Sequence, residues 1–136
     1  MNNDEAFHQL SYYTFAQPRA YFIHQHVVDA YAVQEADETT KPIKIVFGLV
    51  GLYLYLEKGF SGKEVQLFHM KMAKRKIEWP KIVLPEERDE ITVLDVLATP
   101  DAEKDKKIRL WCEKVWEAFA ENRKVIIDLV NHYLKT

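Results

Sequence analysis

The chain has 136 residues, a net charge of −2 and a hydrophobic fraction of 48%. This length lets one ordinary domain bury a core without disulfides or metals. The single cysteine, Cys112, excludes an internal disulfide and a multi-thiolate metal site, and it fits a reducing compartment. The mixed charges offer no basic surface to nucleic acid or anionic lipid. We therefore expect one cytoplasmic domain over residues 1–136, with no nucleic-acid or membrane partner.

Helical segments alternate with short breaks in the first half of the chain. The pattern predicts a first helix over about residues 3–16. Pro18 breaks it and begins a second helix that extends to about residue 35. Further along, Ser61 and Glu64 form a capping-box pattern that begins another helix, expected to end near residue 76.

The helix predicted between these segments is apolar over almost its whole length. Pro42 begins it, and Gly59 ends it as a left-handed C-terminal residue. Its apolar run is only about fourteen residues long and is interrupted by Lys44, whereas a transmembrane helix needs about twenty. We therefore expect the central helix of a soluble bundle. Gly48 and Gly51 lie on one side of it, where they can admit a neighbouring helix closely.

An irregular segment follows over about residues 77–91. Pro80 and Pro85 remove backbone donors and favour extended conformations, and Trp79 is expected to anchor the segment to the bundle. The rest of the chain is again helical. Thr92 caps a short helix over residues 93–98, and the pattern then continues to residue 136.

Asn122 marks a place where this last stretch can break, because asparagine prefers helix caps to helix interiors, and the sequence leaves open whether it does. The whole pattern predicts an all-α fold. It is a single-domain bundle of four to six helices with one irregular segment.

Helix two carries a histidine on its apolar face. At about 100° per residue, His24 falls in the middle of that face. His26 falls on a second apolar strip, and Gln25, Asp29 and Ala32 are expected to face outward. A buried imidazole without a partner costs about 1–3 kcal/mol, so His24 is predicted to form a hydrogen bond or bind a ligand.

Two further polar groups are predicted to face the interior. Glu57, in the last turn of its helix, lies on the same side as apolar residues and at the negative end of the helix dipole. Such a carboxylate needs a cation, a metal or a proton. His69 lies beside the buried stripe of the following helix.

Two imidazoles and one carboxylate on facing helices form a recognised class of divalent-metal site. His24, Glu57 and His69 are therefore predicted as metal ligands, and Tyr31 is predicted to orient a bound substrate. Zinc, manganese and nickel are the candidate ions. A bound ion would lower the pKa of water or of a substrate thiol and so support hydrolase- or transferase-type chemistry.

Three other hypotheses are compatible with the same residues. The first is a polar cluster that only satisfies its own hydrogen bonds. The second is a non-catalytic interaction module or homodimer, suggested by the 12% aromatic content. The third is a small-molecule sensor that uses the polar interior without a metal. The sequence does not decide among these and leaves open whether the protein is an enzyme.

Two stretches resemble a known family. His24-x4-Asp29-Ala-Tyr-Ala-x-Gln34, and Gly51-Leu-x-Leu-x-Leu-Glu57-x-Gly59 followed by His69, are similar to an uncharacterised family of small bacterial helical proteins, a domain of unknown function. The likeness extends over most of the chain. It implies a compact helical fold and a bacterial, cytosolic origin, and it suggests that His24, Glu57 and His69 belong to the family's pattern. It implies no activity.

Overall fold

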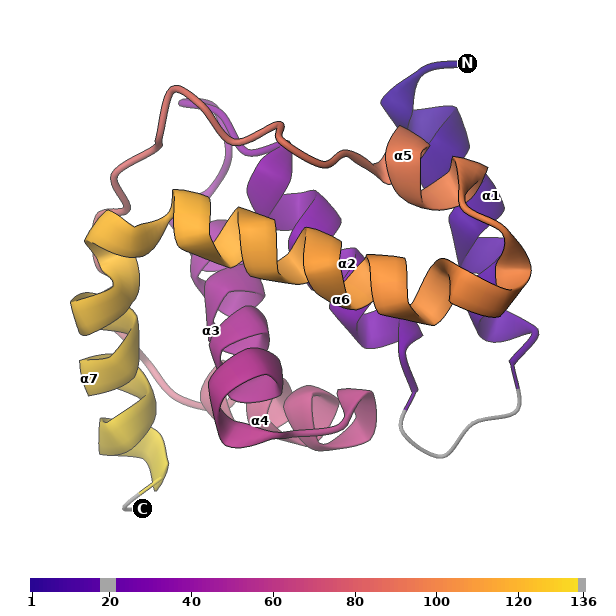
Figure 1. Ribbon diagram of the computed structural model, residues 1–136. Helices are drawn as coiled ribbons and strands as arrows, with labels where there is room; N and C mark the ends of the chain where they lie inside the picture. Colours follow the sequence, from indigo (N-terminus) through magenta and orange to yellow (C-terminus); the bar gives the residue numbers. More distant parts are fainter. Residues whose placement is uncertain (18–21, 135–136) are drawn as a thin grey trace.

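The computed structural model describes residues 1–17 and 22–134, and these residues form helices and loops but no strand (Figure 1). The all-α prediction is confirmed. The helices are α1 (Asn3–Phe15), α2 (His24–Gln34), α3 (Pro42–Lys58), α4 (Gly62–Ala73), α5 (Val93–Ala98), α6 (Asp101–Ala118), the 3₁₀-helix η1 (Ala120–Asn122) and α7 (Arg123–Leu134).

The described part contains seven α-helices, one more than the upper limit of the prediction. The C-terminal helical stretch divides at η1, near Asn122, where the sequence left a break open. The Asn122 side chain is bonded to the irregular segment at this point. Its amide donates to the Val83 carbonyl at 2.9 Å, and its oxygen accepts from the Val83 amide at 2.8 Å. These bonds also hold the irregular segment against the end of α6.

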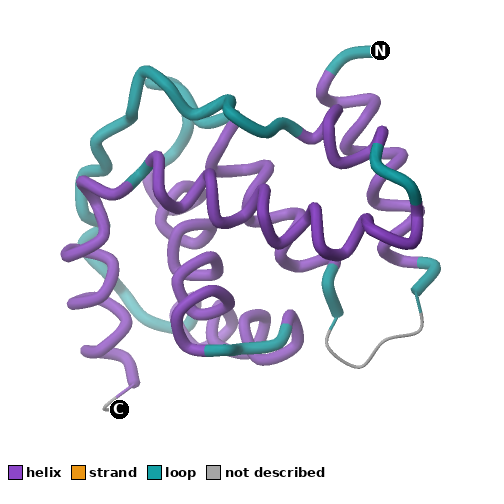
Figure 2. Tube along the Cα trace, in the orientation of Figure 1, coloured by secondary structure: helices purple, strands orange, loops and turns teal. Residues whose placement is uncertain are grey.

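Helix α6 lies across α2 and α3, and α7 packs against α3 at one end of the bundle (Figure 1). Helices α1 and α5 pack together at the other end. The long loop between α4 and α5 runs along the outside of the helices (Figure 2). None of the helices described here is long and apolar enough to cross a membrane.

Local signals in the sequence explain where the helices begin and end. Ser61 and Thr92 each form the predicted cap, completed by Glu64 and Asp95 respectively. Gly59 ends α3 with a φ of 71°, the left-handed conformation that glycine adopts without strain. Helix α2 begins at His24; the part of the predicted helix at 18–21 lies outside the described residues.

The irregular segment is also tied to the bundle through Gln34 at the end of α2. The Gln34 amide donates to the carbonyls of Arg88 and Ile91, at 2.8 and 2.7 Å. Its oxygen accepts from the indole of Trp111, at 2.9 Å. The buried Gln34 side chain thus joins α2, α6 and the irregular segment. It also gives a hydrogen-bond partner to two backbone carbonyls that have none within the segment.

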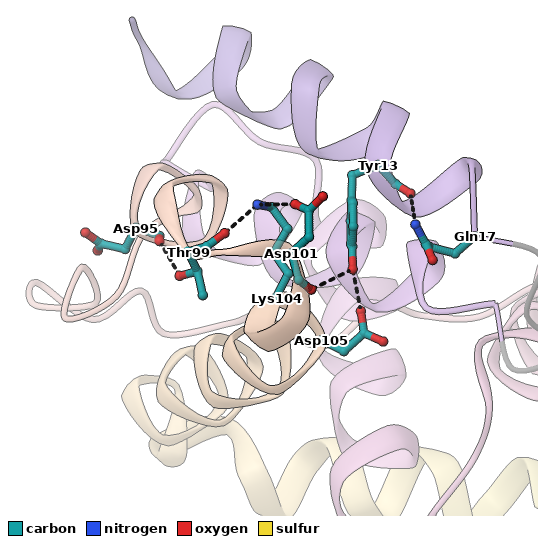
Figure 3. Close-up of polar contacts among 7 residues, drawn as sticks. All are labelled: Tyr13, Gln17, Asp95, Thr99, Asp101, Lys104 and Asp105. Atoms are coloured by element: carbon teal, nitrogen blue, oxygen red, sulfur yellow. Dashed lines mark hydrogen bonds and ion pairs between the residues drawn. The ribbon is translucent and has the colours of Figure 1, made fainter.

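A polar cluster joins α1 to the beginning of α6 (Figure 3). The buried Lys104 ammonium donates to the Thr99 carbonyl and to the Asp101 carboxylate. The Tyr13 hydroxyl of α1 bonds to the Asp101 carbonyl and to the Asp105 carboxylate, both at 3.3 Å. These contacts fix the N-terminal turn of α6, the helix that carries much of the candidate site described below.

Helices α2 and α3 approach closely at two glycines. A Cβ atom on Gly48 would lie 2.5 Å from the Val33 Cγ2 atom. A Cβ atom on Gly51 would lie 1.9 Å from the Asp29 Oδ2 atom. The predicted role of these glycines is confirmed, because any side chain at either position would push the helices apart.

The contact between Gly51 and Asp29 generates a double-mutant prediction. We expect Gly51→Ala to lower the free energy of unfolding by about 1–3 kcal/mol, because the new methyl group overlaps a buried carboxylate. The loss should be smaller in an Asp29→Ala background, where the overlap is gone. Urea unfolding of the four proteins measures this coupling.

Gly59→Ala is the matched control. It faces open space, so its cost of about 1–2 kcal/mol comes from backbone strain alone and should not depend on residue 29. Equal costs of Gly51→Ala in both backgrounds would contradict the packing described here.

Candidate functional site

His24 is buried at the beginning of α2 and has a partner in α1. Its Nδ1 atom lies 2.8 Å from the Thr14 hydroxyl. The same hydroxyl lies 3.2 Å from the Ser11 carbonyl oxygen. The imidazole also packs on the Phe15 ring, with centroids 3.9 Å apart. Burial lowers the His24 pKa. The predicted hydrogen bond is therefore present, and it ties α1 to α2.

Glu57, in the last turn of α3, faces α6 and α7. Its carboxylate accepts from the Trp116 indole at 2.8 Å and from Arg123 Nε at 3.1 Å, and a second Arg123 nitrogen completes a bidentate pair. Hydrogen bonding to Arg123 lowers the Glu57 pKa. The cation that Glu57 was expected to need is therefore Arg123. The pair holds α7 against the bundle.

His69 lies in α4 and contacts α3. Its Nε2 atom donates to the Phe47 carbonyl at 2.8 Å, and its ring stacks on the Phe47 ring. Burial lowers the His69 pKa. Tyr31, the predicted substrate-orienting residue, lies elsewhere. Its hydroxyl donates to Asp4 and its ring stacks on Phe7, so it belongs to the interface of α1 with α2.

The structure does not bring the predicted metal ligands together. His24 faces α1, Glu57 faces α6 and α7, and His69 faces α3. Across residues 1–17 and 22–134, no group of three or more His, Cys, Asp and Glu side chains is placed to hold a metal ion. A helical wheel assigns each side chain an apolar or polar face, but it does not say which neighbouring helix covers that face.

Two residues that sequence reasoning did not select lie on the same helix as His24. Asp29, expected to face outward, is only 3% exposed, because the glycines of α3 let that helix cover it. Gln25 donates to its Oδ1 atom at 3.1 Å, and its Oδ2 atom is buried without a partner. Burial raises the Asp29 pKa well above the usual range. The glycine pair was the only sequence signal of this burial.

His26 is the second missed residue. It is 2% exposed and stacks on the Tyr55 ring of α3, with centroids 3.5 Å apart and planes 8° from parallel. Its Nδ1 atom is buried without a partner. Burial, together with the positive charge of Arg109, lowers the His26 pKa to about 4. The imidazole is therefore neutral at physiological pH.

A groove of about 420 Å³ opens beside this imidazole, between α2, the end of α3, the turn before α4 and the N-terminal half of α6. The Arg109 guanidinium lies 5.1 Å from the centre of the Tyr55 ring, and its Nε donates to Glu113 at 3.2 Å. The residues that line the groove include His26, Tyr55, Phe60, Ser61, Lys106 and Arg109. Its volume lies within the range of small-molecule sites.

A smaller hollow of about 280 Å³ lies on the other side of α2 and is lined by Gln25, Asp29, Phe47 and His69 among others. The His69 Nε2 atom and the Asp29 Oδ1 atom there have protein partners, and the Asp29 Oδ2 atom, which has none, lies against Gly51 of α3. The groove beside His26 is the larger of these two spaces and is lined by cationic as well as aromatic side chains, so we take it as the candidate site.

Residues 4–120 match the model of a family of unknown function, DUF5946. The chain belongs to this family. The matched region of DUF5946 contains every residue that lines the groove beside His26, whereas α7 lies outside it. The membership confirms the resemblance to an uncharacterised family and assigns no activity. No curated protein and no solved structure matches the chain.

The lowered pKa of His26 generates a pH prediction. The unfolded chain binds a proton at His26 near pH 6.5, whereas the folded protein binds it only near pH 4. The free energy of unfolding should therefore fall as the pH drops from about 6.5 to about 4, by up to about 3 kcal/mol from this residue. His26→Gln should remove this part of the fall, measured by urea unfolding at several pH values.

His132, which is exposed, provides the control. His132→Gln should leave the pH dependence unchanged. An identical acid-side slope in His26→Gln and the parent protein would contradict the burial of a neutral imidazole at this position.

Proposed function

We propose that this member of DUF5946 binds a small organic molecule in the groove beside His26, without a metal ion. The proposal rests on the hydrogen bonding of the three histidines that are buried or half-buried in the core. His24 bonds to Thr14, and His69 bonds to Phe47. Neither ring nitrogen of His26 is bonded to another residue in the described part of the chain.

A buried polar group without a partner costs about 1–3 kcal/mol, so such groups are rare unless they have a function. The groove beside His26 offers what a small ligand needs. Tyr55 and Phe60 provide apolar surface, and Lys106 and Arg109 provide charge at the same opening. The combination of an apolar concave surface with a few polar groups is typical of ligand sites.

The divalent-metal function expected for His24, Glu57 and His69 stays a prediction. The separate protein partners of these residues favour the metal-free alternative. The homodimer also stays a prediction, for which the exposed Tyr12 and Phe15 of α1 are the natural candidates. The groove is favoured over the metal site and the homodimer because the imidazole of His26, which lines it, has no hydrogen-bond partner in the protein, whereas His24 and His69 have one.

Titration of the ¹⁵N-labelled protein with a panel of small aromatic and aliphatic compounds tests the proposal. We expect some compounds to shift backbone amide signals of α2, of the turn before α4 and of α6. His26→Phe keeps the stacking on Tyr55 but lacks both ring nitrogens. It should therefore weaken binding by up to about tenfold, which corresponds to the loss of one hydrogen bond. His132→Gln should bind like the parent.

Two results would reject the proposal. One is a panel in which no compound shifts the groove signals, and the other is equal binding to the parent protein and His26→Phe. His26→Gln serves as a second variant if the phenylalanine side chain perturbs the fold. Adding zinc, manganese or nickel to the same sample tests the metal prediction, through shifts at His24, Glu57 and His69.

A further inference from the structure

We infer that the groove beside His26 selects a ligand with an apolar body and a single carboxylate. This inference rests on the proposed function and names its ligand class. It is drawn from the kinds of hydrogen-bonding groups that the groove presents and from the signs of the charges around it.

The positively charged donors of the groove come from one face of α6. Lys106 and Arg109 are three residues apart, so they project from the same side of the helix. Arg109 is positioned by its bond to Glu113 and by the contact of its guanidinium with the Tyr55 ring. A guanidinium has five N–H donors, so these contacts leave others for a ligand. Lysine and arginine side chains donate only, and a ligand between them must accept.

His26 adds a further donor. Its Nδ1 atom is enclosed and has no hydrogen-bond partner, so only its Nε2 atom can meet a ligand in the groove. In the tautomer with its proton on Nε2, that atom is a donor. A ligand that meets the Nε2 side of the ring finds an N–H donor there, in addition to those of α6. A carboxylate accepts hydrogen bonds at both of its oxygens, so several N–H donors in one concave site, two of them cationic, are suited to bind it.

The remaining lining limits the charge and shape of the ligand. Asp105, whose carboxylate accepts from Tyr13, also lines the groove, and the repulsion that it exerts on a ligand grows with each negative charge that the ligand carries. Ile23, Tyr55 and Phe60 supply apolar surface beside the donors. A monoanion with a ring or short chain fits both features better than a phosphate dianion or a fully polar molecule does.

Four probes of similar shape separate these ligand classes: benzoate, benzamide, benzylamine and phenyl phosphate. Each is titrated into the ¹⁵N-labelled protein at pH 7.5, where phenyl phosphate is a dianion. Benzoate should shift the groove signals and bind at least about tenfold more tightly than benzamide and phenyl phosphate, with benzylamine the weakest. Arg109→Gln should remove most of the preference for benzoate over benzamide, and Arg109→Lys should keep part of it.

Lys124→Gln is the matched control, because Lys124 is an exposed cation on α7, away from the groove. It should leave the order of the four probes unchanged. Benzamide binding as tightly as benzoate in the groove would overturn the carboxylate inference and leave the proposed function standing. An unchanged preference in Arg109→Gln would overturn the inference as well. If none of the four probes and no other compound shifts the groove signals, both the inference and the proposed function fail.

Discussion

The close contact of α2 with α3 is the constraint on which the rest of the structure depends. Gly48 and Gly51 remove the side chains that would hold the two helices apart, and Val33 and Asp29 fill the space. The result is a helix pair in which Asp29, expected to face outward, is buried, while Gln25 and Ala32 beside it are half-buried. Helix α6 then packs across both helices.

This burial determines what each polar residue of α2 does. His24 faces α1, where it forms a hydrogen bond with the Thr14 hydroxyl, and Gln34 joins α6 to the irregular segment. These two residues stabilise the fold. His26 faces Tyr55 and the groove, and it alone among the core histidines has no partner within the described residues. A buried imidazole whose ring nitrogens have no hydrogen-bond partner in the protein is better explained by ligand binding than by stability.

Local features of the fold could be predicted, and features that depend on distant packing could not. The caps at Ser61 and Thr92 and the end of α3 at Gly59 follow from preferences that act within a few residues. The burial of Asp29 depends on a glycine more than twenty positions away in the sequence. The metal prediction had the same weakness, since it identified polar residues on helix faces without knowing which helix covers each face.

The imidazole ¹⁵N spectrum of the protein tests the central claim most directly, because it reports each histidine separately. At pH 7, His26 should show a neutral ring with an unprotonated Nδ1, and its Nε2 signal should move when benzoate is added. The signals of His24 and His69 should stay in place, since both rings are bonded to protein groups outside the groove. A His26 signal that titrates near pH 6.5 and does not respond to benzoate would contradict the account.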